Sequence, residues 1–426
     1  MNINYLCLTV ILLFTLIIVF KCCVKIKYKF WSYQPVFHYH NLLYWIYPKG
    51  VINTALPEPN KYCNFINIIT REFAEYNDTT LDKILAFIAA NYYTQQSVTY
   101  APSREYLTSY FSGVNNKAHI SLYYKPIALL TDTGFAMEQE IAAIMTTRSV
   151  NITLHGCETF PAYYVECLCV HNSYRRQDLA PQLIQTHIYN VYHRNKTIKY
   201  QVRVSLFKRE GVITGIVPLT AYNTYQFDIS AIPKNSASLH ASTPIIEINK
   251  LNIRLLTSFI HTQSKRFKCF VLPDLVNLLR LINSKIYMVY GIIENQELIA
   301  AYFFRDSQLR DKKISPVSPL NNVLEGEQNV SNTMTTIDFF GSINNTCDDN
   351  MFLIGFNTAL RKAIKRDPKV SKKSVKLITI ENISDNNLVI NNLFALNIVP
   401  KFTNPTAYFY YNYAKRPIIP ELAFIL

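Results

Sequence analysis

Glycine is scarce in this sequence, with only 10 glycines among 426 residues. This is about a third of the usual frequency, so functions built on several glycine-rich phosphate loops are disfavoured. Charged residues are also few, at 17%, whereas hydrophobic residues make up 49% and aromatic residues 13%. A chain of this composition can bury enough apolar surface to fold, which excludes a largely disordered or collagen-like protein.

The short motifs of the common enzyme classes are missing too. The sequence contains no G-x-S-x-G, Walker, dinucleotide-binding or HExxH motif, so it lacks the usual hydrolase, kinase and oxidoreductase signatures. Its nine cysteines form no C-x-x-C pair and are odd in number, which fits neither a disulfide framework nor a zinc ribbon. His38 and His40 are the only close histidine pair. Without further ligands at suitable spacing, we predict a surface loop there and no metal site.

The N-terminal region contains the longest apolar run. Between Tyr5 and Phe20 there is no charge, and twelve of the sixteen residues are Leu, Ile, Val or Phe. This predicts a single membrane-spanning helix, because each such residue favours insertion and the apolar residues 22–24 extend the run. A cleaved signal peptide is disfavoured, since no positive charge precedes the run and no A-x-A-like site follows it.

Positive charge decides how this anchor should be oriented. Lysines lie only on the C-terminal side of the apolar run, at positions 21, 25, 27 and 29, so the positive-inside rule predicts a single-pass protein whose remainder faces the cytosol. The net charge of +14 attracts nucleic acid, anionic lipid or an anionic cofactor alike. A second basic run at 361–376 contains no interleaved aromatic residues. We therefore expect an anionic membrane surface as partner rather than nucleic acid, although both runs are also explained as solvated faces.

About 400 residues remain after the anchor, which is more than one hydrophobic core usually holds, so two domains are expected. Prolines at 35, 48, 57 and 59 exclude a long helix directly after the anchor. Apolar periodicity then predicts helices over 64–76 and 81–92, strands over 120–130, 141–147, 151–154 and 163–170, a helix from 180 and a strand over 199–207. Thr79 or Thr80 is the expected N-cap of the second helix.

The second half repeats this order. The pattern predicts helices over 247–261 and 273–283, strands over 285–293 and 298–305, a polar insertion over 306–335, a strand over 336–342, a helix over 350–366, a strand over 374–380, a helix over 387–396 and a strand over 407–413. The predicted fold class is thus α/β (α+β), with two similar units in tandem. The expected divisions are 1–27 for the anchor and basic segment, 28–235 for the first unit and 236–426 for the second.

One constellation points to chemistry. A predicted strand ends at His171, Arg175 and Arg176 follow, and a helix starts at Ala180. A helix N-terminus behind arginines binds anions through its dipole, its free N–H groups and the added charge. A strand, a basic turn and a helix in this order are how acyltransferases of the GCN5-related type hold the pyrophosphate of CoA.

Three segments together resemble one family. Residues 28–36 (YKFWSYQPV) are similar to Y-x-F-W-x-T-Q-P-V, residues 168–181 match L-C-V-H-x3-R-x3-[LV]-A-P, and residues 408–413 (YFYYNY) with the apolar end 423–426 are similar to Y-Y-x-Y-N-W and the family's C-terminus. The family is N-myristoyltransferase (glycylpeptide N-tetradecanoyltransferase), which is built from two GCN5-related acyltransferase-like units. The likeness extends from about residue 28 to the end of the chain.

This resemblance implies an activity and a set of site residues. Members transfer a long-chain acyl group from acyl-CoA, with myristoyl-CoA as co-substrate and no metal, to the N-terminal glycine of proteins. The resemblance implies an oxyanion hole formed by the amides of Cys167 and Leu168, and a general base in the terminal carboxylate of Leu426, whose low pKa in water burial would have to raise. It also assigns acyl-CoA binding to Tyr28, Lys29, Phe30, Trp31, Leu168, Cys169, Val170, Arg175, Arg176, Leu179 and Ala180, and peptide binding to Gln201, Tyr408 and Tyr410.

Some positions depart from the family pattern. The family's R-S-K-R reads Arg175-Arg176-Gln177-Asp178 here, and its Thr-Ala-Gly aligns with residues 201–203 (QVR). A catalytically degenerate, membrane-tethered relative that acts as a binding or structural protein is therefore the alternative prediction. Cys169 and His171 alternate on one strand, but small cysteines in strands are usually core residues, so covalent catalysis by Cys169 is disfavoured.

Overall fold

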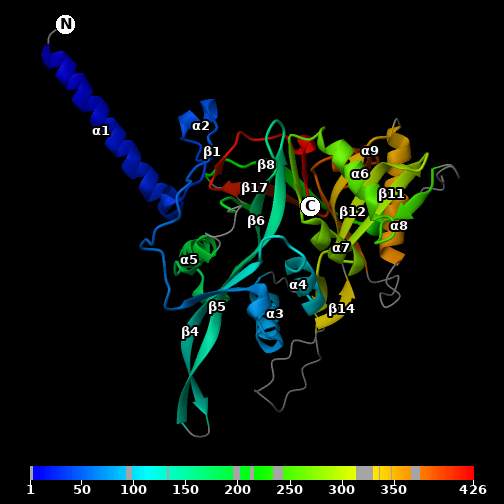
Figure 1. Ribbon diagram of the computed structural model, residues 1–426, viewed down its shortest axis with the longest axis horizontal. Helices are drawn as coiled ribbons and strands as arrows, with labels where there is room; N and C mark the ends of the chain where they lie inside the picture. The colour runs from blue at the N-terminus through cyan, green and yellow to red at the C-terminus, as the bar shows by residue number, and fades with distance from the viewer. Residues whose placement is uncertain are drawn as a thin grey trace.

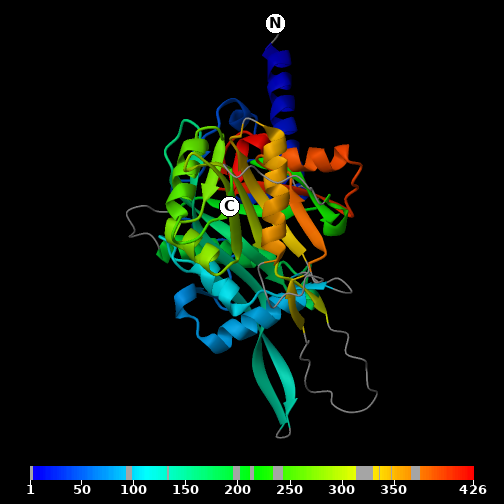
Figure 2. The same ribbon diagram turned by 90° about the vertical axis from the view of Figure 1, so that its right-hand side faces the viewer.

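The computed structural model describes residues 3–92, 98–131, 134–194, 202–211, 215–233, 243–312, 330–334, 336–346, 348–365 and 375–426. Helix α1 (Ile3–Tyr28) projects from one end of the molecule, and the hairpin of β4 and β5 projects from the opposite end (Figures 1 and 2). In the described part of the chain, one helix, α1, is long and apolar enough to cross a membrane. None of its apolar stretch is buried inside the protein.

The first unit is built on five strands. These are β2 (Ile68–Glu72), β4 (His119–Thr131), β5 (Gly134–Leu154), β6 (Phe160–Val170) and β7 (Ser205–Glu210). Neighbouring strands from β2 to β6 pair antiparallel, whereas β7 pairs parallel to β6. Helix α5 (Leu179–Arg194) makes the crossover between β6 and β7, as a parallel connection requires.

The second unit repeats this topology. Its strands β11 (Tyr287–Glu294), β12 (Glu297–Asp306) and β15 (Thr336–Asn344) pair antiparallel, and β16 (Leu377–Glu381) pairs parallel to β15 after helix α8 (Asp349–Lys365). The tandem α/β arrangement predicted from the sequence is thus confirmed.

Strands from both units meet in the middle of one sheet. Strand β8 (Thr220–Asp228) pairs with β16, and β17 (Phe402–Tyr411) lies between β7 and β8. Among the described residues, the resulting sheet has 14 strands and also contains β9 (Ile245–Glu247), β10 (Cys269–Leu272) and β19 (Ala423–Ile425). Strands of both units belong to one sheet, so the sheet itself has no break that would mark a domain boundary. The boundary at residue 235 between the two units remains a prediction.

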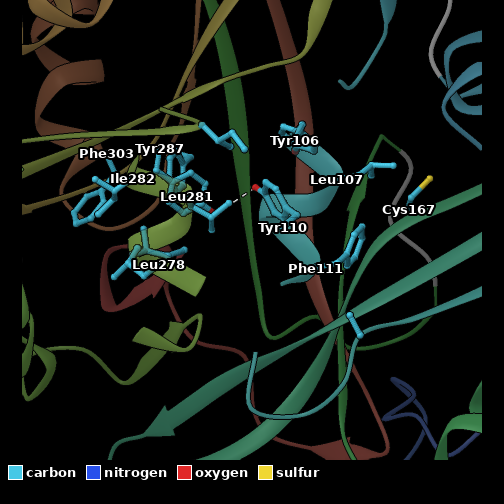
Figure 3. Packing of buried hydrophobic residues seen from close by; sticks show 14 of the residues in the cluster. Tyr106, Leu107, Tyr110, Phe111, Cys167, Leu278, Leu281, Ile282, Tyr287 and Phe303 are labelled. Carbon is cyan, nitrogen blue, oxygen red and sulfur yellow. Dashed lines mark hydrogen bonds between the residues drawn. The ribbon is translucent and has the colours of Figure 1, made fainter. Parts of the chain in front are cut away.

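The helix pairs of the two units pack against each other. The pairs are α3 (Asp78–Asn91) with α4 (Arg104–Phe111), and α6 (Ile253–Ser264) with α7 (Leu275–Asn283). Figure 3 shows apolar residues of α4 and α7 facing one another, with the Tyr110 and Tyr287 hydroxyls 3.3 Å apart. Helix α9 (Asn386–Ala395) covers β15 and β16 through a second cluster of buried residues.

The remaining elements are short. Helix α2 (Leu42–Ile46) follows the anchor, β1 (Gly50–Val51) pairs with β18 (Tyr413–Ala414), and β3 (Val98–Tyr100) forms a small sheet with β13 (Leu309–Lys312) and β14 (Val330–Met334). Most of the predicted polar insertion, at 313–329, and most of the basic run at 361–376, at 366–374, lie outside the described residues.

Several sequence expectations were wrong. Residues 64–76 contain strand β2 rather than a helix, because Ile68 and Thr70 alternate with exposed residues and pair with β4. The runs 141–147 and 151–154 belong to the single strand β5. Asn77, and not Thr79 or Thr80, caps α3 by accepting a hydrogen bond from the amide of Thr80. The helix predicted over 247–261 begins only at Ile253, after strand β9, and α4, β8 and β10 were missed.

Candidate functional site

The site begins where two parallel strands separate. In the described part of the chain, β6 and β7 pair from Tyr163 with Ser205 to Val165 with Phe207. A β-bulge follows at once: Val165 lies opposite Thr147 and Cys167 opposite Thr146, so Glu166 is the extra residue. Bulges bend a strand and re-aim its side chains, and they often occur next to active sites. Here the residues of β6 that follow the bulge no longer pair with β7, and a gap opens in the sheet.

A first cleft, of about 420 Å³, lies at the end of β6 and the start of α5. Its wall consists of Asn91, Tyr92, Leu168, Cys169, Val170, Tyr174, Arg175, Arg176, Asp178, Leu179, Ala180 and Pro181. Arg175 is held by a hydrogen bond from Nη2 to the Asn91 carbonyl oxygen, at 2.8 Å. The α5 N-terminus and two arginines therefore share one cleft, which suits a phosphate or pyrophosphate group.

Helix α5 is fixed in this position by its buried face. Leu183, Ile188 and Val191 are among its buried residues and pack into the same cluster as Phe30. Arg176 and Asp178 immediately before the helix both have positive φ angles, of 64° and 56°, and both are exposed. The turn thus presents one negative charge beside two positive charges, which weakens its field for anions.

A second cavity, of about 360 Å³, lies within the gap between β6 and β7. It is lined by Trp31, Tyr92, Met145, Val165, Glu166, Leu168, Ile184, Ile188, Ser205, Phe207, Lys208, Arg209, Glu210 and Tyr411. Trp31 stacks on Phe207 with 6.0 Å between ring centroids. Tyr92 and Leu168 line both cavities. An elongated ligand with an anionic end and an apolar chain would therefore cross from one cavity to the other at Leu168.

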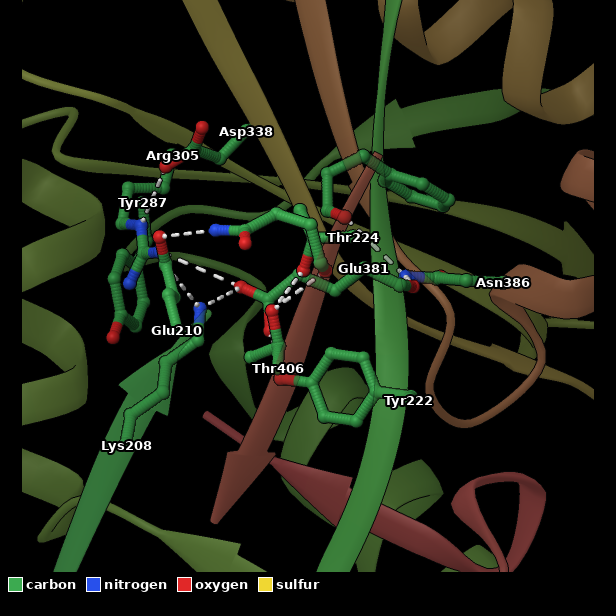
Figure 4. A network of polar contacts seen from close by, with 12 residues as sticks. Lys208, Glu210, Tyr222, Thr224, Tyr287, Arg305, Asp338, Glu381, Asn386 and Thr406 are labelled. Atoms are coloured by element: carbon green, nitrogen blue, oxygen red, sulfur yellow. Dashed lines mark hydrogen bonds and ion pairs between the residues drawn. The ribbon is translucent and has the colours of Figure 1, made fainter. Parts of the chain in front are cut away.

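At the polar end of the second cavity, Lys208 is held in place by a network of ion pairs and hydrogen bonds around Glu381 (Figure 4). Lys208 Nζ lies 3.0 Å from a Glu381 oxygen and 3.5 Å from Glu210, and Glu381 also bonds Tyr222 and contacts Arg305. Burial disfavours the charged form of Lys208, but Glu381 and Glu210 outweigh it and raise its pKa. Lys208 therefore remains a cation beside the cavity, fixed by strands from both units.

Most residues assigned to acyl-CoA lie in this region. Trp31, Leu168, Cys169, Val170, Arg175, Arg176, Leu179 and Ala180 line one or both cavities. Tyr28, Lys29 and Phe30 are not among the lining residues. Tyr28 instead packs against His38, with 5.3 Å between ring centroids, and Phe30 is buried between Trp31 and Tyr62. Phe30 thus supports Trp31 from behind the cavity, whereas Lys29 is exposed.

The proposed peptide-binding residues do not line the two cavities where the structure describes them. Tyr408 and Tyr410 on β17 are buried, and neither lines the two cavities. Tyr408 is close to the Glu381 network, and Tyr410 contacts the Cys269 sulfur at 3.7 Å. Gln201 lies outside the described residues.

The proposed catalytic groups have different surroundings. Leu168 is 37% exposed at the junction of the cavities. The Cys167 amide donates a hydrogen bond to Thr146 Oγ1 at 3.0 Å, so it already has an acceptor. Leu426 is buried, its amide donates to the Val271 carbonyl oxygen at 3.1 Å, and it does not line either cavity. Burial raises the pKa of the Cys169 thiol to about 12, which disfavours its use as a nucleophile.

Sequence reasoning missed Glu166. Its carboxylate lies 3.5 Å from Nε of Arg148, whose side chain is only 2% exposed, and the Arg148 guanidinium lies over the rings of Tyr110 and Tyr164 at 4.9 and 5.3 Å. The signal was present, because Glu166 and Arg148 are single charges within otherwise uncharged strand segments. A charge in a half-buried strand needs a partner or a function.

Comparison with solved structures identifies the architecture. Yeast (Saccharomyces cerevisiae) N-myristoyltransferase with bound myristoyl-CoA matches with a TM-score of 0.62 at 13% identity, covering 92% of this chain and 94% of that chain. The chain has the fold of N-myristoyltransferase. A second structure of the yeast enzyme, with bound myristoyl-CoA and inhibitors, gives a TM-score of 0.64 at 13% identity and covers 94% of both chains. No protein-family model and no curated protein sequence matches the chain, so the similarity to N-myristoyltransferase is one of fold.

Proposed function

We propose that this protein is an N-myristoyltransferase-like enzyme that transfers a long-chain acyl group from acyl-CoA to the N-terminal glycine of proteins. We further propose that α1 anchors it in a membrane with the acyltransferase units in the cytosol. The lysines at the C-terminal end of α1 support this orientation.

One observation carries the proposal: a cleft lined by two arginines and a helix N-terminus meets a largely apolar cavity at Leu168. The first cleft offers Arg175, Arg176 and a helix N-terminus to the pyrophosphate of CoA, and the second offers Trp31, Phe207 and Ile188 to an acyl chain. The thioester of a bound acyl-CoA would then lie beside the bulge in β6. This is where strand irregularity frees backbone groups from the sheet ladder.

The chemistry needs no nucleophile from the protein. The glycine amine attacks the thioester carbon, the carbonyl π electrons move to oxygen, and collapse of the tetrahedral intermediate expels the CoA thiolate. The Leu168 amide, with that of Cys167, is proposed to stabilise the oxyanion. A carboxylate must accept a proton from the amine. The resemblance assigns this role to Leu426, which lines neither cavity. The side-chain carboxylates that line the second cavity are those of Glu166 and Glu210.

A non-catalytic relative is the second candidate function, and two observations favour it. The Cys167 amide is engaged by Thr146, so an oxyanion would compete with an internal acceptor. Asp178 places a negative charge in the anion cleft, which opposes CoA binding. In this alternative the protein retains acyl-CoA or peptide binding without transfer.

Acyl transfer can be tested directly on the full chain in nanodiscs. The protein is incubated with myristoyl-CoA and a peptide that begins with glycine, and the products are analysed by mass spectrometry. The proposal predicts a peptide whose mass has increased by one myristoyl group, and no product when the same peptide is acetylated at its N-terminus. Binding of myristoyl-CoA or of the glycine peptide without product supports the non-catalytic candidate. Absence of product and of both kinds of binding contradicts the two candidates.

A further inference from the structure

The short helix α2 exposes an unusual group of large apolar side chains. Leu42 is 71% exposed, Leu43 75%, Ile46 59% and Tyr47 78%. Single exposed apolar residues are normal on a protein surface, but four within six residues form a patch that requires a partner. We call residues 42–47 the α2 patch.

The α2 patch lies beside the membrane-anchor helix. The ring of His40, two residues before α2, is 5.8 Å from the ring of Phe20 and 5.8 Å from that of Tyr28. Phe20 is the last residue of the uncharged apolar run of α1. Figures 1 and 2 both show α2 on the side of the domain from which α1 projects. A bilayer crossed by α1 would therefore have its surface at the level of α2.

The groups around the patch match the chemistry of a membrane surface. Tyr39 and Tyr47 are exposed in this segment, at 47% and 78%, and such aromatic residues favour the interface between water and lipid. A basic side chain is near as well, because Arg416 donates a hydrogen bond to the Ile46 carbonyl oxygen. Cations at this level would face the anionic headgroups.

The opposite face of the same segment is fixed to the domain. Tyr44 and Trp45 pack on the buried ring of Phe37, with centroid distances of 5.7 and 5.1 Å. Trp45 Nε1 also donates a hydrogen bond to the Tyr39 carbonyl oxygen at 3.1 Å. The aromatic side chains thus hold α2 in place while its leucines and isoleucine remain exposed.

We propose that the α2 patch is a second membrane contact, inserted among the lipids of the leaflet from which α1 emerges. The inference rests on the proposed insertion of α1, and it adds a distinct contact with a distinct role. One helix alone leaves the domain free to rotate about its tether. A second contact fixes both the height and the rotation of the domain over the bilayer. It thereby also fixes the position of Trp31, which closely follows α1 and lines the second cavity.

Tryptophan fluorescence tests this contact on the full chain. The protein has two tryptophans, so W31F leaves Trp45 as the single reporter within the segment. The variant is reconstituted into phosphatidylcholine–phosphatidylserine vesicles with or without lipids brominated near the headgroup end of the acyl chain. We expect bromolipid to quench Trp45 emission and the membrane to protect it from acrylamide. In the same background, L42S with L43S should reduce both effects, whereas L251S, at a 95% exposed leucine elsewhere, should leave them unchanged.

Vesicle flotation separates this inference from the anchor on which it rests. If the protein floats with the vesicles and Trp45 emission is the same with and without bromolipid, α1 is inserted and the α2 contact is wrong. If the protein does not float, the membrane anchor is wrong, and the inference is overturned with it. If L251S reduces quenching as strongly as L42S with L43S, the effect is not specific to the α2 patch and the inference also fails.

Discussion

Asp178 offers a prediction in which removing a charge should improve ligand binding. Its carboxylate lies in the same cleft as Arg175 and Arg176, directly before α5. Replacing Asp178 by Asn removes the negative charge and keeps a residue type that tolerates the positive φ angle of 56° at this position. Because the side chain is exposed, the fold should be unaffected and only the electrostatic potential of the cleft should change.

The size of the effect follows from Coulomb's law. A carboxylate about 6 Å from one phosphate charge costs roughly 0.7 kcal/mol in a water-like dielectric and more where solvent is partly excluded. The two charges of a pyrophosphate therefore correspond to about 1.4 kcal/mol, or roughly a tenfold change in dissociation constant. We expect D178N to bind myristoyl-CoA about 3- to 10-fold more tightly than the native chain at low salt.

Isothermal titration calorimetry on the detergent-solubilised full chain measures this change. The gain should shrink in about 1 M salt, where the screening length is only about 3 Å. E297Q is a matched control, because it removes one exposed negative charge at the β11–β12 turn of the second unit. Equal affinity of D178N and native protein at low salt, or an equal gain in E297Q, would refute an anion site at this cleft.

Three further predictions concern the base, the buried ion pair and the packing of the second unit. Adding one Gly after Leu426 should lower kcat by about 10²–10⁴-fold with little change in Tm, since it replaces the terminal carboxylate by an amide; unchanged turnover would remove Leu426 from the mechanism. E166Q should lower the free energy of unfolding by about 1–3 kcal/mol in urea denaturation, because it leaves the buried Arg148 cation without its partner at 3.5 Å; an unaltered midpoint would show that the pair is not stabilising. G355A should destabilise by about 1–3 kcal/mol, because the added Cβ would lie 2.3 Å from Tyr302 Oη; a Tm equal to that of the native protein would contradict the packing.

Local sequence signals predicted those elements whose structure depends on neighbouring residues. Asn295 and Gln296 adopt positive φ angles in the turn between β11 and β12, as a polar hairpin turn requires. The apolar spacing after Ala180 predicted α5, in which Leu183, Ile188 and Val191 are buried. The repetition of these local patterns also predicted the two α/β units.

Residues 64–76 show where local pattern was insufficient. Their apolar spacing suits a helix, yet the segment pairs with β4, and the hydroxyls of Thr70 and Ser121 lie 2.7 Å apart across the two strands. Pairing with a strand about 50 residues away determines its structure, and short apolar runs do not reveal such a partner.

The candidate site also has one part that local sequence predicts and one part that depends on long-range contacts. The basic turn was predictable from local sequence, because Arg175, Arg176 and the start of α5 are adjacent along the chain. The second cavity was not predictable in this way, since Trp31, Phe207 and Tyr411 come from segments far apart in sequence. They meet because β17 of the second unit pairs with β7 of the first, and this pairing depends on long-range strand contacts that no local periodicity encodes.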